Sequence, residues 1–174
     1  PERNTGIMYH TTIGDKISLQ AGGFFEANSY GNDKELTNKL NITSRLTYLV
    51  MNNEDNVLHI GVANSRRDNS ANTYSFSSRA ENHLGTKLLQ SEFAGVEKTN
   101  ILGAEIAYVR DRLSLQGEYL RTIVSLNPQV EPHEYPYADE YELNGYYGQI
   151  SYFLTGESRA YKSSYEGFNR VKPN

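Results

Sequence analysis

The chain has 174 residues, a formal net charge of −4 and no cysteine, which excludes disulfide-stapled scaffolds and cysteine-based metal sites. Its mean hydropathy is −0.65, and no run approaches the ~18 uninterrupted apolar residues that a membrane helix needs, so a helical span is excluded. Fourteen tyrosines and fourteen glycines against five prolines favour extended structure, because aromatic rings pack well on a pleated surface.

Alternation of apolar and polar residues predicts three hairpins and one further strand. They cover about residues 4–27, 37–67, 99–125 and 142–155. The segment Leu40–Val50 alternates most regularly, and Gly14-Asp15-Lys16 and Arg110-Asp111-Arg112 have the composition of tight turns. Because side chains of a strand point to opposite faces in turn, each segment has one apolar and one polar face.

The connections between these segments alternate in length. Short connections at 14–16, 51–56 and 110–112 alternate with long ones at 28–36, 64–99 and 127–141. In an up-and-down sheet this order places all tight turns at one end and all long loops at the other, as in outer-membrane barrels. The sequence therefore predicts an all-β fold, an antiparallel up-and-down transmembrane β-barrel.

The predicted strands number seven, whereas bacterial single-chain barrels close with even numbers from eight upward. Two open sheet edges inside hydrocarbon would leave backbone N–H and C=O groups unpaired, at a cost of several kcal/mol each. We therefore expect the chain to be a segment of a single, larger barrel domain.

Three tyrosines on the predicted apolar faces lie near the short-turn end: Tyr48, Tyr108 and Tyr152. A phenol ring prefers hydrocarbon at one edge and water at its hydroxyl, so this position predicts an aromatic girdle at the membrane interface. The alternative is aromatic packing in the core of a soluble β-sandwich.

Several stretches in the second half carry a family resemblance. The most specific is Gly145–Arg159, which continues into Phe168–Pro173, and the others are Ser78–Leu84 and Leu113–Tyr119. They resemble the phosphate-selective porin O and P family, whereas residues 1–75 match only in hairpin pattern. The resemblance implies a trimeric outer-membrane porin of about sixteen strands that passes anions.

The resemblance also implies a pore lined by arginines and lysines. Residues 156–174 are longer than a usual periplasmic turn, and folding into the pore would bring their cations to the solute. The candidate pore-lining and anion-binding residues are Lys39, Arg45, Arg159, Lys162, Arg170 and Lys172. Such groups supply the charge-assisted hydrogen bonds that a desolvated phosphate needs. Glu26, Glu105 and Glu118 share the predicted lumen face and oppose anion preference.

No catalytic, metal or cofactor constellation stands out. The four histidines lack metal-ligand spacing; they are His10, His59, His83 and His133. Glu105 and Glu118 on neighbouring strands have the residue types of a glycosidase pair, but lumen charges explain them more simply. The basic residues are dispersed, so a nucleic-acid footprint is absent. We expect no enzyme, no cofactor and no metal.

The predicted function is passive diffusion of small solutes, with phosphate and other anions as candidates, through a pore in the bacterial outer membrane. The expected partners are these solutes, membrane lipid and two further copies of the protein. The alternative is a soluble β-sandwich that binds carbohydrate on its tyrosines. A porin would require detergent for extraction, whereas a sandwich would purify from the aqueous fraction.

Overall fold

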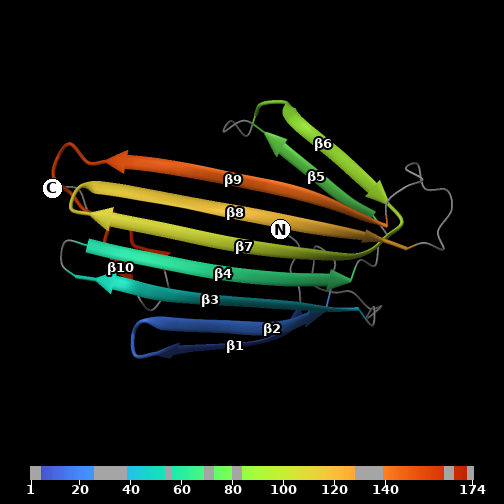
Figure 1. The fold of residues 1–174 in the computed structure, drawn as a ribbon, viewed down its shortest axis with the longest axis horizontal. Helices are drawn as coiled ribbons and strands as arrows, with labels where there is room; N and C mark the ends of the chain where they lie inside the picture. The colour runs from blue at the N-terminus through green and yellow to red at the C-terminus, as the bar shows by residue number, and fades with distance from the viewer. Residues whose placement is uncertain are drawn as a thin grey trace.

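The computed structural model describes residues 5–25, 39–53, 56–68, 73–79, 84–127, 139–162 and 167–171, and within them the regular structure is β-strand (Figure 1). The principal element is a seven-stranded antiparallel sheet with the strand order β1-β2-β3-β4-β7-β8-β9. Its strands are β1 (Thr5–Ile13), β2 (Ile17–Phe25), β3 (Leu40–Asn52), β4 (Asn56–Asp68), β7 (Val96–Arg110), β8 (Leu113–Leu126) and β9 (Glu140–Tyr152). The prediction of an all-β, antiparallel up-and-down sheet is confirmed.

The described part of the chain holds no helix long and apolar enough to cross a membrane.

Two small hairpins accompany the sheet. β5 (Thr73–Arg79) pairs with β6 (Lys87–Ala94), and β10 (Tyr161–Lys162) pairs with β11 (Gly167–Phe168). The sequence predicted residues 64–99 as one long connection, but β4 continues to Asp68 and β7 begins at Val96, and β5–β6 occupies the interval. Backbone pairing does not need apolar side chains, so the ladder runs beyond the region where apolar alternation marks it.

Tight turns lie at one end of the sheet. Figure 1 shows the β1–β2 and β7–β8 turns, the end of β3 and the start of β4 together at the left-hand end, whereas β2, β4 and β8 end toward the right. The first turn uses Gly14 at φ 58° and Asp15 at φ 54°, and the third uses Asp111 at φ 47°. Glycine and aspartate tolerate this left-handed conformation, which tight hairpin turns of two or three residues use.

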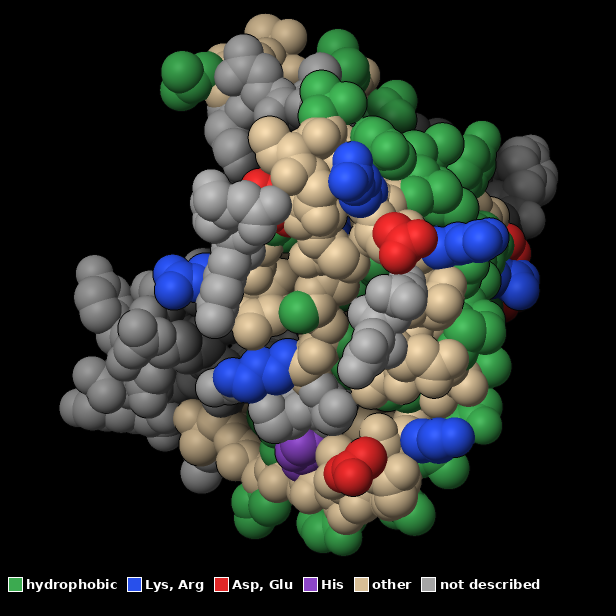
Figure 2. Space-filling model, turned by 90° about the vertical axis from the view of Figure 1, so that its left-hand side faces the viewer, with side chains coloured by type: hydrophobic (Ala, Val, Ile, Leu, Met, Phe, Trp, Pro, Cys, Tyr) green, Lys and Arg blue, Asp and Glu red, His purple; other side chains and the backbone are tan. Residues whose placement is uncertain are grey.

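The register aligns the apolar faces of all seven strands into one surface, which we call the apolar face. Val62 is 56% exposed and Ile106 is 54% exposed, and Figure 2 shows hydrophobic side chains gathered along one margin of the molecule. The apolar band ends toward the long connections at an ion pair between Arg121 and Glu142, 2.6 Å apart. Within the described residues no second layer buries this face, so the sandwich alternative is not supported.

The opposite surface, the polar face, is better covered. Ser18, Thr47 and Ser114 are each less than 5% exposed. At the short-turn end three apolar side chains of this face form a small buried cluster, and Tyr161 and Phe168 pack against it; the cluster is Leu49, Val57 and Val109. One packed cluster therefore lies on the polar side beneath β10 and β11, while Val96 and Val124, both 0% exposed, are buried at the opposite end of β7 and β8.

Candidate functional site

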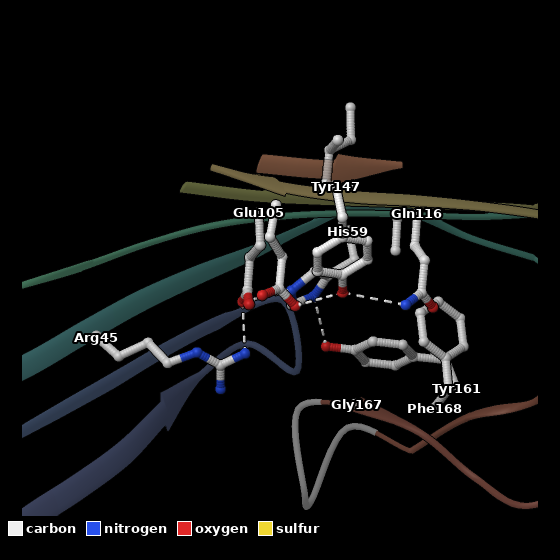
Figure 3. Close-up of a pocket in the computed structure, with 12 residues that line it drawn as sticks. Arg45, His59, Glu105, Gln116, Tyr147, Tyr161, Gly167 and Phe168 are labelled. Carbon is white, nitrogen blue, oxygen red and sulfur yellow. Dashed lines mark hydrogen bonds and ion pairs between the residues drawn. The ribbon is translucent and has the colours of Figure 1, made fainter. Parts of the chain in front are cut away.

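The chain folds back onto the polar face after β9. Gly156 has φ 100°, a conformation that glycine adopts without the steric cost other residues meet. Beyond it, Tyr161 pairs with Phe168 across the β10–β11 ladder, and both rings contact the buried cluster described above. We call β10–β11 the inner hairpin. It lies where the sheet presents its polar side chains, as Figure 3 shows for Tyr161, Gly167 and Phe168.

Tyr161 connects the inner hairpin to β4. Its hydroxyl lies 2.9 Å from Nδ1 of His59, and the two rings are tilted with centroids 5.5 Å apart. Tyr161 also meets Phe168 edge-on at 5.6 Å, a favoured aromatic arrangement. The hydrogen bond fixes which part of β4 the hairpin covers.

Arg159 connects the start of the hairpin to β8. Its Nη1 donates to Oε1 of Gln116 at 2.7 Å and lies 3.4 Å from Oγ of Ser114. Its guanidinium carbon sits 4.4 Å from the centroid of the Phe168 ring, within cation–π range. This arginine therefore holds the hairpin against the sheet wall in addition to carrying charge.

A charged network lies on the polar face of the sheet beside the inner hairpin, and we call this part of the sheet the wall. Glu105 of β7 accepts a hydrogen bond from Nη2 of Arg45 on β3, and its Oε1 lies 3.0 Å from Nε2 of His59. His59 thus bridges the carboxylate to Tyr161 of the hairpin. These groups come from β3, β4, β7 and the returning chain, so the sheet register brings them together.

A second carboxylate faces the same region. Glu118 pairs with Glu105 directly across the β7–β8 ladder, where like charges repel. The two carboxylates have different partners, since Glu118 accepts a hydrogen bond from the Tyr147 hydroxyl at 2.8 Å. Nε2 of Gln116 in turn donates to that hydroxyl at 3.2 Å. The neutral Tyr147 phenol therefore stabilises the Glu118 carboxylate by a hydrogen bond, whereas Arg45 pairs with Glu105.

The polar face and the inner hairpin line a cavity of about 110 Å³ that is open on one side. Figure 3 shows its labelled lining side chains converging on the space between the sheet and the hairpin. One guanidinium, one imidazole and two carboxylates line it, with three further aromatic rings; they are Arg45, His59, Glu105, Glu118, Tyr147, Tyr161 and Phe168. The cavity can accept a small hydrated solute, and its lining carries two carboxylates against one guanidinium.

The predicted pore-lining cations fall into separate places. Arg45 lies in the wall and Arg159 under the hairpin, both near the cavity. Lys162 and Arg170 are exposed on and beside the inner hairpin, and Lys39 is half-buried next to β3 at the long-connection end. Lys172 and the predicted lumen acid Glu26 lie outside the described residues. The structure therefore joins Arg45 to a carboxylate and leaves Lys39 remote from the cavity.

Several site residues were missed by sequence reasoning. From the sequence, His59 is considered only as a metal ligand and that role is rejected, and no role in a site is predicted for Gln116, Tyr147, Tyr161 or Phe168. Alternation did contain a signal for three of them, because His59, Gln116 and Tyr147 all have the parity of the polar face. Nothing local in the sequence shows that Tyr161 and Phe168 return to that face.

The three tyrosines predicted as a girdle all lie on the apolar face. Tyr48 is 40% exposed and Tyr152 is 60% exposed, and Tyr108 lies two residues before the end of β7. All three are toward the short-turn end of their strands.

Across the described ranges, no three histidine or acidic side chains gather closely enough to hold a metal ion.

An up-and-down antiparallel sheet with an exposed apolar face, a polar face and segregated turns is the architecture of an outer-membrane β-barrel. The chain belongs to the phosphate-selective porin O and P family, whose model matches residues 2–174. It is 28% identical over 189 residues to Porin O of Pseudomonas aeruginosa, across 97% of this chain. The chain spans 40% of the length of that relative.

The family assignment confirms the predicted resemblance and extends it. Sequence motifs tied only the second half to the family, whereas the match also covers the first two hairpins. The predicted location in the bacterial outer membrane is confirmed with the family.

Proposed function

We propose that the protein carrying this chain forms a water-filled channel for passive diffusion of small solutes across the outer membrane. The single observation that carries the proposal is the division of one sheet into two faces. Ile150 is 75% exposed on the apolar face, whereas Arg45 and Glu105 meet on the polar face. Lipid against the apolar face and water against the polar face give each set of side chains a favourable surrounding.

Anions, with phosphate among them, are the proposed solutes. The family description names phosphate, and Lys162 and Arg170 are exposed on or beside the inner hairpin. Guanidinium and ammonium groups replace part of an anion's hydration shell with charge-assisted hydrogen bonds. Glu105 and Glu118 act against this preference, so selectivity depends on the balance between hairpin cations and wall acids.

The proposal contains no covalent step. Glu105 and Glu118 are held by Arg45, His59 and Tyr147 in a network that supports the wall. We infer a channel rather than an enzyme. Contact of the apolar face with lipid and assembly with two further copies belong to the same proposal, as the family resemblance implies.

Electrophysiology tests the function directly. The full-length protein, inserted in a planar bilayer, should conduct ions continuously and show a reversal potential of anion-selective sign in a KCl gradient. Lys162→Gln and Arg170→Gln should each lower the anion-to-cation permeability ratio, because each removes a cation beside the inner hairpin. Lys87→Gln, on the exposed β6 strand, is the matched control and should change nothing. A protein that inserts without conducting would refute the channel.

A further inference from the structure

The carboxylate of Glu105 reaches across a neighbouring strand. In the register, Glu105 of β7 faces Gly61 of β4, whereas Arg45 of β3 faces Ala63. The Arg45–Glu105 ion pair therefore joins β3 to β7 diagonally across β4. Its side chains are 30% and 26% exposed, so water screens the pair less than it screens a pair on an open surface.

Gly61 provides the space for this reach. A Cβ atom placed on Gly61 would overlap Oε1 of Glu105 and lie 2.8 Å from its Cγ, so the carboxylate side chain lies directly over the Gly61 backbone. Any larger residue there would push Glu105 away from its place between Arg45 and His59. Gly61 is thus a positioning residue for the ion pair.

We propose that Glu105, held over Gly61, withholds the Arg45 guanidinium from anions in the pore and so determines the specificity of the pore wall. An anion that approaches Arg45 meets the Glu105 carboxylate already on the guanidinium, and like charges at contact repel. Anion contact is left to the cations of the inner hairpin. This inference rests on the proposed channel function, and it assigns to Glu105 the role of limiting anion contact with Arg45.

Glu118 offers a matched comparison, because it lies opposite Glu105 on the same face and its hydrogen-bond donor is the neutral Tyr147. Glu105→Gln and Glu118→Gln each remove one negative charge, so both should shift the reversal potential in the direction of greater anion selectivity. Only Glu105→Gln removes the carboxylate that lies on the Arg45 guanidinium. Inorganic phosphate should therefore block chloride current at about fivefold lower concentration in Glu105→Gln than in Glu118→Gln.

Two further variants separate release of Arg45 from loss of charge. Adding Arg45→Gln to Glu105→Gln should abolish the gain in phosphate block. Gly61→Ala leaves every charge in place and should strengthen phosphate block with little change in reversal potential. Gly103→Ala is its control, because a Cβ there meets Leu120 at 3.4 Å and no carboxylate.

The outcomes separate this inference from the proposed function. A wild-type protein without conductance would overturn both. A conducting channel in which Glu105→Gln and Glu118→Gln change phosphate block equally would overturn the inference alone. Should Glu105→Gln fail to fold, Gly61→Ala decides: phosphate block no stronger than in Gly103→Ala rejects the role of Glu105.

Discussion

The apolar and polar faces of the sheet differ in how their side chains are satisfied. On the apolar face, Val62 and Ile106 remain more than half exposed and need only a surrounding that does not compete for hydrogen bonds. On the polar face, His59 makes specific contacts to Glu105 and Tyr161. The comparison teaches that the outer side chains are interchangeable among apolar types, whereas the inner ones depend on particular partners.

A charge placed on each face tests this comparison with the largest expected effect. Val62 on the apolar face is 56% exposed and Leu120 on the polar face is 49% exposed, so the two sites differ mainly in what they meet. Val62→Arg should lower the free energy of unfolding in lipid vesicles by about 2–4 kcal/mol, because the guanidinium would enter hydrocarbon. The variant is therefore expected to be less stable. Leu120→Arg, facing water, should cost less than about 1 kcal/mol.

Urea titration of the full-length protein in vesicles measures both changes. Equal destabilisation by Val62→Arg and Leu120→Arg would mean that the two faces do not meet different solvents, and the membrane-spanning interpretation would then fail.

Much of this two-faced sheet was predictable because its information is local. A strand repeats every two residues, so Arg45 and Tyr48 fall on opposite faces wherever the strand lies. Turn composition was equally local, and Gly14 and Asp111 both adopt the left-handed conformation that a tight turn uses. Register followed, because a slip by one residue would move a whole apolar face to the polar side.

The site was less predictable because its contacts join distant parts of the chain. Arg45 and Glu105 are 60 residues apart in sequence, and His59 and Tyr161 are 102 apart. No alternation in residues 156–174 shows where that segment returns. Arg159 was predicted as an anion contact, and its described contacts hold the hairpin to Gln116, a role that only the folded arrangement reveals.

Removing one tyrosine hydroxyl from each face should change stability by an intermediate amount and tests the same comparison. Tyr161→Phe deletes the hydrogen bond to His59 and should destabilise the folded protein by about 0.5–1.5 kcal/mol, because Nδ1 of the buried His59 ring loses its partner. Tyr146→Phe is the matched change on the apolar face, where the ring is 87% exposed, and should leave stability unchanged. Urea titration compares them, and equal effects would show that the inner hairpin is not held by Tyr161.

The smallest effect concerns the tyrosines of the apolar face, which are staggered along the ladder. Through β4, the row of Tyr48 reaches Ile106, two residues before Tyr108. Through β8, the row of Tyr108 reaches Ile150, two residues before Tyr152. A shift of one residue per strand is a rise of about 3.4 Å for each spacing of about 4.8 Å, or a slope of about 35°. Barrel strands tilt by about 35–45° from the membrane normal.

The stagger and the tilt therefore cancel, and the three tyrosines should lie at one depth although no strand pairs them directly. Nitroxide labels on Tyr48→Cys, Tyr108→Cys and Tyr152→Cys, each in a background otherwise free of cysteine, should report depths equal to within about 3 Å in lipid vesicles. Strands that crossed the membrane upright would give successive steps of about 7 Å. Such steps would contradict the girdle, because an interfacial belt requires one plane where hydrocarbon meets water.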